Sequence, residues 1–330
     1  MSWYRKLITK DNFFSVLGSK KGPWLGDYLA MYSSQWQGYV TDPALMMVPV
    51  DDHMVHRGDG VFDVMRCIHG RVYQMEAHLN RLERSARAIA LDLPHEYDDV
   101  REVIKSLILA GGEKECLVRV FLSRGPGSFS ANPFDSPASQ MYIIVITTHE
   151  MPKEYYAEGI PIITSKVPVK KSFFATIKSC NYLPNVLMKM EALRAGCPYA
   201  VAFDDDGFLA EGSTENIAVL SMEGVLEFPG FENTLAGITA ERVFTLAGVA
   251  GKEKMIRGVR FHKISAEDAY RASEIMLLGT SIDIVPVVGF DGKPIGKGRP
   301  GPLYTTLSDL LRKDMTENRE LLTEIDWEKK

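Results

Sequence analysis

The sequence around Lys178 combines residue types that suit covalent chemistry on an aldehyde. Lys178 stands in IKSCNYLPNVLMKMEA, just ahead of a predicted helix, and Glu211 follows in the turn AEGSTEN between two apolar, strand-like runs. A lysine amine condenses with an aldehyde, and a carboxylate can hold a ring nitrogen in its protonated form. The pair therefore fits chemistry on pyridoxal 5'-phosphate. Taken alone, Lys178 could equally be a surface lysine and Glu211 part of an ordinary acidic turn.

A phosphate group needs backbone N–H groups, hydroxyls and a positive charge, and other segments offer all three. LAGIT, residues 235–239, leads into the helical pattern AERVFTLAGVA, so Thr239 is a plausible N-cap and the first turn could bind an anion. A Gly-Thr-Ser turn at 279–281 follows the strand-like run EIMLL, and Arg81 on an earlier helix could supply the charge. The simpler alternatives are that Thr239 only caps its helix and that Arg81 pairs with Glu83 or Glu76.

Three other patterns could suggest a functional site, but their sequence context argues against it. His53 and His56, with aspartates nearby, lack a distant His or Cys that would complete a metal-ligand spacing, so no metal is expected. Residues 296–301 match GxGxxG, but they follow a predicted hairpin and contain a proline, which favours a loop. Ser123 and Ser213 have no His/Asp arrangement that would support serine hydrolysis.

Composition and charge exclude several classes of protein. The chain has 330 residues, 45% of them hydrophobic, which is enough for two domains, and a net charge of −5 without a dense Lys/Arg block argues against nucleic acid as a partner. No run reaches membrane-spanning length, and the first residues lack the apolar core of a secretory signal. Four dispersed cysteines without a CxxC pair predict reduced thiols. We expect an intracellular, cytoplasmic protein that does not bind membranes.

The apolar periodicity predicts an α+β fold with mixed sheets, because strands and helices do not alternate regularly. VFDVMRCIHGRVYQM indicates two strands joined at 69–71. Two helical patterns follow, then two strands, and the second half adds three helices and a hairpin turn at Asp291-Gly292. The predicted helices are EAHLNRLERSARAIA, VREVIKSLILAGG and segments near 182–195, 240–250 and 302–314, and the two strands are 116–123 and 140–147.

The segment 125–139, GPGSFSANPFDSPAS, is rich in Gly, Pro and Ser and predicts the connection between domains. This places a smaller N-terminal α+β domain at 1–124 and a larger C-terminal, cofactor-binding domain at 140–330. The highly charged tail, 315–330, is expected to fray.

Five motifs occur in order along the chain: HLNRLERSA, IKSCNYLPNVLMKMEA, FDDDGFLAEGSTENIAV, LAGITAERV and MLLGTSIDIVPV. Together they resemble the class IV aminotransferases, which are pyridoxal phosphate enzymes of fold type IV, over about 43–311. Within that family, ALMMVPVDDHMVHRGDGVFDV and FLSRGPGSF look most like the plant-type D-amino-acid transaminases. The resemblance implies a two-domain fold type IV enzyme that uses pyridoxal 5'-phosphate.

The resemblance also assigns roles to individual residues. It makes Lys178 the base that bonds the cofactor and Glu211 the partner of the ring nitrogen, while Tyr182 falls where relatives carry a Tyr or Leu beside the cofactor. Leu235 would pack against the ring. The phosphate-binding runs contribute Arg81, Gly237, Ile238, Thr239 and Thr280.

The chain departs from its relatives where the substrate carboxylate is held. Bacterial D-amino-acid transaminases use a Tyr and an Arg-x-His that here look to be Val55 and the SFSAN segment, and the strand Tyr of branched-chain enzymes is Leu117. A carboxylate favours the planar fork of a guanidinium. Of the nearby cations Arg57, Arg119 and Arg124, the first two are the better candidates, and Ser281 is a third substrate candidate.

We expect a ping-pong transaminase that moves an amino group between an amino acid, preferably a D-amino acid, and a 2-keto acid, working as a homodimer. The alternatives are a branched-chain L-amino acid aminotransferase, an aminodeoxychorismate lyase, and a cofactor-binding protein without turnover. The sequence leaves the enantiomer, the side-chain specificity and the balance of transamination and lysis open, because family members present the same cofactor face.

Overall fold

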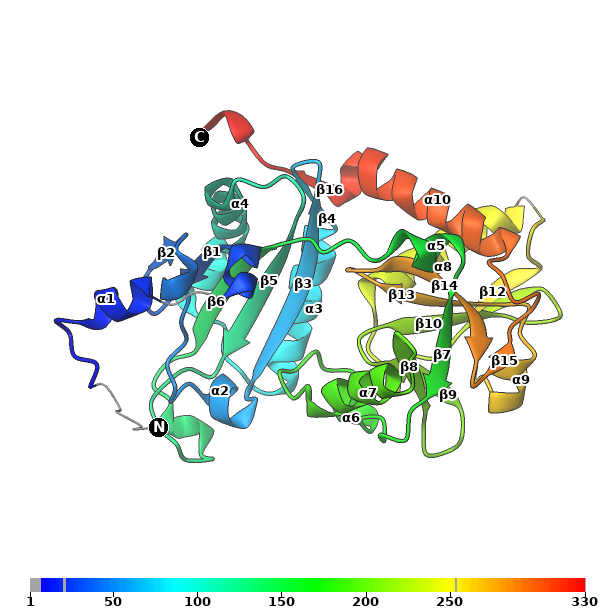
Figure 1. The fold of residues 1–330 in the computed structure, drawn as a ribbon, viewed down its shortest axis with the longest axis horizontal. Helices are drawn as coiled ribbons and strands as arrows, with labels where there is room; N and C mark the ends of the chain where they lie inside the picture. Colours follow the sequence, from blue (N-terminus) through cyan, green and yellow to red (C-terminus); the bar gives the residue numbers. More distant parts are fainter. Residues whose placement is uncertain (1–6, 20–21, 253, 330) are drawn as a thin grey trace.

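The computed structural model describes residues 7–19, 22–252 and 254–329, whose strands form two sheets that lie side by side (Figure 1). The seven-stranded first sheet is antiparallel throughout. The nine-stranded second sheet combines antiparallel pairs with three parallel ones. Helices pack on both sheets, so the predicted α+β class is confirmed.

The first sheet takes strands from the start, the middle and the end of the chain. Its strands, in spatial order, are β16 (Leu322–Glu324), β4 (Arg71–Tyr73), β3 (Gly60–Ile68), β5 (Cys116–Ser123), β6 (Gln140–Thr147), β1 (Tyr28–Ser33) and β2 (Gly38–Val40). The predicted strands at 116–123 and 140–147 are confirmed to the residue, and the predicted hairpin at 69–71 joins β3 to β4.

The second sheet is built from the chain between residues 160 and 294. Its path is β12 (Gly258–Phe261), β11 (Val225–Phe228), β10 (Asn216–Leu220), β13 (Glu274–Gly279), β14 (Asp283–Phe290), β7 (Ile160–Thr164), β8 (Tyr199–Phe203) and β9 (Leu209–Gly212), with β15 (Lys293–Pro294) paired to β14. The predicted turn at Asp291-Gly292 connects β14 and β15.

The longer helices match the predicted ones. They are α3 (Met75–Ala88), α4 (Val100–Gly111), α7 (Leu183–Arg194), α8 (Ile238–Lys252) and α10 (Pro302–Glu317). The shorter α-helices are α1 (Phe13–Gly18), α2 (His53–Arg57), α5 (Lys153–Ala157), α6 (Ser172–Ala175) and α9 (Ala266–Tyr270). Short 3-10 turns occupy Pro23–Asp27, Pro43–Leu45, His95–Asp99, Pro133–Asp135, Arg319–Leu321 and Trp327–Lys329. No helix among the described residues is long and apolar enough to cross a membrane.

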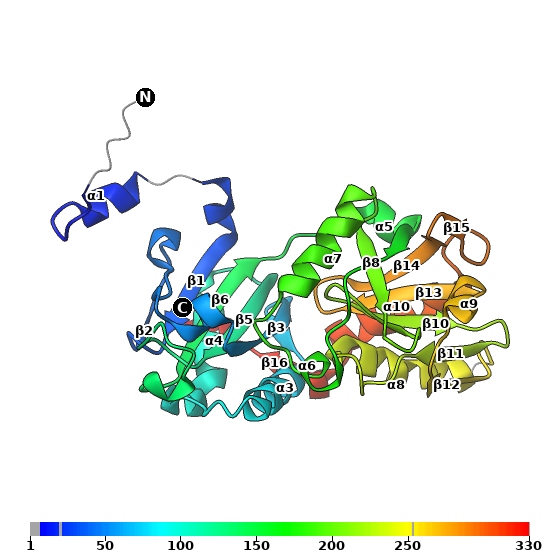
Figure 2. The same cartoon turned by 90° about the horizontal axis from the view of Figure 1, so that it is seen from below.

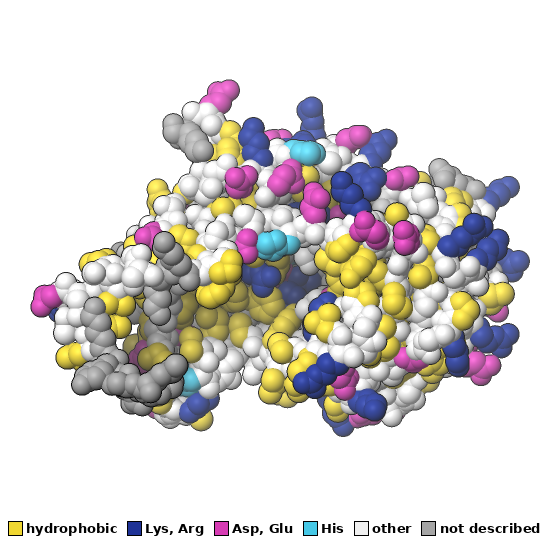
Figure 3. Space-filling view, in the orientation of Figure 1, with side chains coloured by type: hydrophobic (Ala, Val, Ile, Leu, Met, Phe, Trp, Pro, Cys, Tyr) yellow, Lys and Arg dark blue, Asp and Glu magenta, His cyan; other side chains and the backbone are white. Residues whose placement is uncertain are grey.

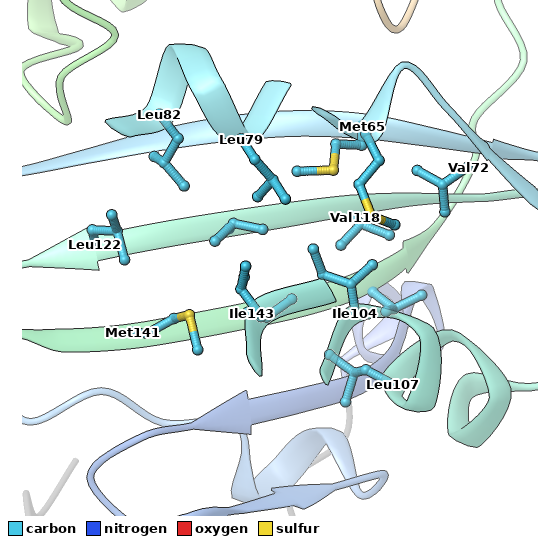
Figure 4. Close-up of a cluster of buried hydrophobic side chains, with 14 of the residues drawn as sticks. Met65, Val72, Leu79, Leu82, Ile104, Leu107, Val118, Leu122, Met141 and Ile143 are labelled. Atoms are coloured by element: carbon cyan, nitrogen blue, oxygen red, sulfur yellow. The ribbon is translucent and has the colours of Figure 1, made fainter. Parts of the chain in front are cut away.

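Helices α3 and α4 cover one face of the first sheet because their apolar stripes meet the apolar face of its strands. Leu79 and Leu82 of α3 are fully buried, as are Ile104 of α4 and Val118 of β5. Figure 4 shows these side chains pointing toward one another. Burying such large aliphatic side chains stabilises the fold by roughly 2 kcal/mol each. The core leaves the opposite face of the sheet directed toward the second half of the molecule.

The predicted domain division differs from the division between the sheets. Residues 125–139 connect β5 to β6, and these two strands pair along their whole length, so the segment is a loop within the first sheet. Strand β6 therefore does not belong with the C-terminal half. The chain leaves the first sheet after Thr147 and enters the second at Ile160, and we propose that residues 148–159, which include α5, form the connection.

The expectation that the tail frays is wrong for its described part. Strand β16 pairs with β4, so the end of the chain returns to the first sheet. Asp314 near the end of α10 accepts hydrogen bonds from Tyr73 of β4 and from Arg242 of α8. Charged residues dominate this tail in sequence, but its start is fixed by the buried Asp314 carboxylate just before it, which bonds to both halves of the molecule.

Candidate active site

Lys178 lies where the two halves of the molecule meet, in the segment between α6 and α7 (Figure 1 and Figure 2). Its carbonyl oxygen accepts a hydrogen bond from the Phe62 amide at 3.0 Å, and the Cys180 amide donates to the Gly60 carbonyl at 2.8 Å. The backbone amide of Lys178 also donates to the Ser85 hydroxyl at 3.2 Å. Main-chain contacts with β3 and α3 therefore fix the position of Lys178.

The amine of Lys178 is surrounded by aromatic rings. Its Nζ lies 5.0 Å from the centroid of the Phe62 ring and 3.4 Å from the Tyr182 hydroxyl. Burial, reinforced by the Arg81 guanidinium, lowers the pKa of Lys178 to about 8. At a pH of about 8, an ordinary lysine with a pKa near 10.4 is almost wholly protonated, whereas about half of the Lys178 side chains carry the neutral amine. Lys178 is thus placed and tuned to act as a nucleophile or a base.

Glu211 lies on β9 and not in the turn that the sequence suggested, and that turn, residues 213–215, follows the strand. Its Oε2 accepts a hydrogen bond from the Leu235 amide at 3.1 Å. Burial raises the pKa of Glu211 to about 7, although the Leu235 N–H favours the ionised form. The positive charges of Lys170 and Lys178 act in the same direction as that N–H. A carboxyl group with this pKa can hold or give up a proton near neutral pH.

The predicted phosphate ligands lie together with Lys178 around a cavity of about 190 Å³. The start of α8 forms one wall, and the turn after β13 forms another. The cavity is lined by Arg81, Tyr182, Leu235, Gly237, Ile238, Thr239, Thr280 and Ser281 among others. Helix α8 begins at Ile238, so Thr239 lies inside the first turn and the prediction that it is the N-cap is wrong. The N–H groups of that turn and the hydroxyls nearby form a donor set that suits an anion.

Arg81 is not a surface residue paired with Glu83 or Glu76, because only 5% of it is exposed. Its Nε and Nη2 donate to the Asp63 carboxylate at 2.8 and 2.7 Å, and its Nη1 donates to the Ala236 carbonyl at 3.1 Å. These contacts hold the guanidinium at the cavity wall beside the first turn of α8.

Asp63 and His78 are residues that the sequence interpretation missed. His78 Nδ1 lies 2.7 Å from Asp63 Oδ1, and both side chains are buried. Burial alone would raise the pKa of Asp63, but Arg81 and His78 together lower it far below its usual range. A signal existed in the sequence: Asp63 interrupts the alternation of Val61 and Met65 on the apolar face of β3, where an acid needs a partner.

Of the arginines considered for the substrate carboxylate, Arg119 is the one in place. It lines the Lys178 cavity and also an adjoining recess of about 790 Å³. Its Nε is buried without a partner, and its side chain makes no hydrogen bond or ion pair with any described residue. Arg57 is exposed, donates to the Phe129 carbonyl and lines neither cavity, while Arg124 is engaged by the Asp59 carboxylate.

The adjoining recess is apolar along most of its wall, and Figure 3 shows it as a hollow between the two halves with hydrophobic side chains around it. Helix α7 forms one side, and β5 and β6 form the other. Its apolar lining includes Leu117, Ile146, Val186, Met190, Leu193 and Ile282. Arg119 and Ser281 border both the recess and the Lys178 cavity, so a molecule with a charged end and an apolar end could contact both spaces.

The remaining sequence patterns have structural partners. His53 is buried in α2, and its Nδ1 lies 3.2 Å from the Asp59 carboxylate. Among the residues described, no group of three or more His, Cys, Asp or Glu side chains is arranged to hold a metal ion. Ser213 donates to the Glu215 carboxylate, and residues 296–301 form the loop between β15 and α10.

The two sheets, with Lys178 at their junction and Glu211 on a strand of the second, form the fold of the fold type IV transferases. The chain belongs to the class IV aminotransferases: the family model described as "Amino-transferase class IV" matches residues 60–290. A D-amino-acid transaminase, chloroplastic, of Arabidopsis thaliana is 40% identical over 289 residues, which cover 87% of this chain and 77% of that protein. A putative branched-chain-amino-acid aminotransferase of Methanocaldococcus jannaschii is 30% identical over 82% of this chain and 92% of that one.

Solved structures show the same fold. The Escherichia coli branched-chain amino acid aminotransferase gives a TM-score of 0.82 at 25% identity and covers 91% of this chain and 100% of that one. The branched-chain amino acid aminotransferase of Thermobaculum terrenum, in its PLP form, gives a TM-score of 0.78 at 20% identity, with 91% and 99% of the two chains covered. The protein is therefore an aminotransferase, of a class that depends on pyridoxal phosphate.

The unpaired guanidinium of Arg119 leads to a first prediction. Replacing Arg119 by Met should raise the KM for the best amino-acid substrate by about tenfold to a hundredfold, because a charge-assisted hydrogen bond to a carboxylate contributes roughly 1.5–3 kcal/mol. Steady-state kinetics measure the change. Arg57→Met is the control, since Arg57 lines neither cavity. An unchanged KM in the Arg119 variant, or a defect confined to the Arg57 variant, would contradict this assignment.

Proposed function

We propose that this aminotransferase binds pyridoxal 5'-phosphate and moves an amino group between an amino acid, preferably a D-amino acid, and a 2-keto acid by a ping-pong mechanism. The single observation that carries the D-amino-acid preference is the 40% identity with the Arabidopsis D-amino-acid transaminase over 87% of this chain. The geometry around Lys178 and Glu211 supports the cofactor. The pyruvate or 2-oxoglutarate class is the expected acceptor.

The residues present fit this cofactor. A lysine with a pKa of about 8 and a carboxyl with a pKa of about 7 line one small cavity, and the same lysine lines a second cavity that contains hydroxyls, a held guanidinium and the first turn of α8. We assign Lys178 to the aldehyde end, Glu211 to the ring nitrogen and Leu235 to the ring face, with Tyr182 beside them. The phosphate is assigned to Arg81, Gly237, Ile238, Thr239 and Thr280. When bound, pyridoxal phosphate supplies an aldehyde carbon and an electron-withdrawing ring.

Lys178 is the proton carrier of the site. Because its pKa is about 8, its Nζ can take a proton and release it near physiological pH without a large cost in either direction. The Tyr182 hydroxyl lies 3.4 Å away and stays protonated, because burial raises the pKa of Tyr182. It can therefore donate a hydrogen bond toward the space beside the amine. Phe62 closes another side and excludes water.

Arg119 and Ser281 orient the substrate. The Arg119 guanidinium is available for a carboxylate, because none of the described side chains pairs with it. The Ser281 hydroxyl borders the same two spaces. With its carboxylate held there, a substrate would direct its side chain into the apolar recess beside α7. That recess favours apolar side chains over charged ones.

A branched-chain L-amino acid aminotransferase is the second candidate function. The Methanocaldococcus jannaschii relative carries that description at 30% identity, and the apolar recess suits branched side chains as well. The two candidate functions share the cofactor site and differ in the orientation of the substrate. An assay with different amino acids therefore distinguishes them, and cofactor binding does not.

The main test concerns Lys178. Borohydride reduction of the holoenzyme should fix the cofactor to Lys178, as located by peptide mass mapping, and Lys178→Ala should lose the label and lower turnover by a factor on the order of a thousand or more. In cofactor-depleted protein, the rate of attachment should rise with pH and level off above about 8, because the neutral amine is the nucleophile. Lys171→Met, an exposed lysine paired with Asp205, is the control. A label on another side chain would refute the assignment.

A panel of D- and L-amino acids tests the substrate class. Single D-amino acids should bleach the cofactor band of the holoenzyme, and regeneration of that band should require an added 2-keto acid. Reaction with only L-leucine, L-isoleucine and L-valine would favour the second candidate. Absorbance at substrate saturation is the measurement, with glycine and an amine lacking a carboxylate as controls.

We also propose a homodimer and a cytoplasmic location. Helix α7 exposes large apolar side chains, including Leu183 at 68% and Leu193 at 61%, next to the recess. Patches of this kind are typical of protein interfaces. All four cysteines are free, which fits a reducing compartment.

Sedimentation equilibrium should give about twice the chain mass of 36.9 kDa. The variant Leu193→Glu should shift the equilibrium toward the single chain, because burying an unpaired carboxylate in an interface is unfavourable. Leu93→Glu, the same change at an exposed leucine outside α7, is the matched control for added charge. A single-chain mass for the native protein at all concentrations would rule out the dimer.

A further inference from the structure

A second lysine, Lys170, lies beside the candidate active site and has no role so far. It lies between β7 and α6 and lines one small cavity with Lys178, Tyr182 and Glu211. Its Nζ is 4.8 Å from the centroid of the Tyr182 ring, and Lys178 Nζ is 5.9 Å from the same centroid. Two lysine amines thus lie near one aromatic ring, and the Glu211 carboxylate lines the same cavity.

Lys170 forms no ion pair with any of the described residues. It makes no hydrogen bond and no ion pair within 4.0 Å there, and Glu211 is the charged group that acts on it. Burial lowers the pKa of Lys170, and Glu211 opposes that shift. The next residue, Lys171, differs because it is exposed and its Nζ lies 2.6 Å from an Asp205 carboxylate oxygen. A partly buried ammonium without a bonded partner is costly, which suggests that it serves the site.

Charged groups and one hydrogen bond act on the protonation of Glu211. Lys170 and Lys178 favour the ionised carboxylate, Glu215 disfavours it, and the Leu235 N–H supplies one hydrogen bond. Lys178 cannot serve as a permanent cation, because its amine has to lose a proton before it acts as a nucleophile. The proposed function does not require Lys170 to lose a proton.

We propose that Lys170 is a positioning residue that keeps Glu211 ionised, so that this carboxylate can bind a protonated ring nitrogen while Lys178 is neutral. The inference rests on the proposed function. In this proposal Lys170 supplies a positive charge beside the Glu211 carboxylate, and Lys178 is the separate lysine that bonds the cofactor. Glu211 would then lie between two positive groups, the Lys170 ammonium and the protonated ring.

The test is the affinity of the full-length, cofactor-depleted protein for pyridoxal 5'-phosphate between pH 6 and pH 9, measured by absorbance. Lys170→Met should weaken binding by about fivefold at pH 7 and by nearly tenfold at pH 6, the effect of raising the pKa of the Glu211 carboxyl from about 7 by about one unit. The difference should shrink as the pH rises, because Glu211 then ionises without help. Lys170→Arg should restore binding, and Lys171→Met should match the wild type.

A double-mutant cycle separates this role from a structural one. If Lys170 acts through Glu211, Lys170→Met should have little further effect in a Glu211→Gln background. Lys170→Gln is made alongside in case the Met variant does not fold, and circular dichroism checks both. Equal affinity of Lys170 variants and wild type at every pH, or an equal loss in the Glu211→Gln background, would overturn the inference. Failure to label Lys178 in the wild type would instead refute the proposed function.

Discussion

The main-chain contact between β3 and the segment around Lys178 is the constraint on which the rest of the site depends. Val61 and Ser179 form an isolated bridge, and Phe62 and Gly60 hydrogen bond to the residues on either side. The same strand carries Asp63, which holds Arg81. A single strand of the first sheet therefore sets both the backbone of Lys178, which lies in the second half of the chain, and the guanidinium that faces it. A shift of β3 would move both ends of the cavity together.

Burial shifts the pKa values of Lys178 and Glu211 in opposite directions. Removing water disfavours the charged form of each, which lowers the pKa of Lys178 and raises that of Glu211 until both lie near neutrality. The pair does not form a direct ion pair within 4.0 Å, so neither charge is locked by the other. Asp63 shows the contrasting outcome: it is fully buried, but two cationic or donating partners keep its pKa low. The number of partners, and not burial alone, separates a structural carboxylate from a titratable one.

Local patterns are enough to predict most of the elements, and pairings distant in sequence are not visible in them. Strands β5 and β6 are predicted to the residue because CLVRVFLS and QMYIIVIT are short runs rich in apolar and β-branched residues, bounded by polar and turn residues. The same two strands pair with each other, which no local signal reveals, so the Gly/Pro/Ser-rich loop between them resembles an interdomain connection. The tail departs from its prediction for a related reason: its charges indicate disorder, while β16 gains its stability from β4, which lies far earlier in the chain.

In the candidate site too, residues in local motifs are predicted from the sequence, and residues whose role depends on a distant partner are not. Lys178, Glu211 and the phosphate-binding runs lie in compact motifs whose residue types already indicate their chemistry, and the fold brings the motifs together. Asp63 and His78 lie inside runs that resemble the family but receive no role there, and Lys170 lies outside those runs, because the role of an acid or base becomes visible only beside its partner. The choice between Arg57 and Arg119 is open in the sequence for the same reason. Arg119 lies on the face of β5 that points away from the α3 and α4 core, and its guanidinium has no partner among the described residues. The second sheet covers that face and encloses the cavity that Arg119 lines. The unpaired charge becomes a candidate site for a substrate carboxylate because the second sheet lies there.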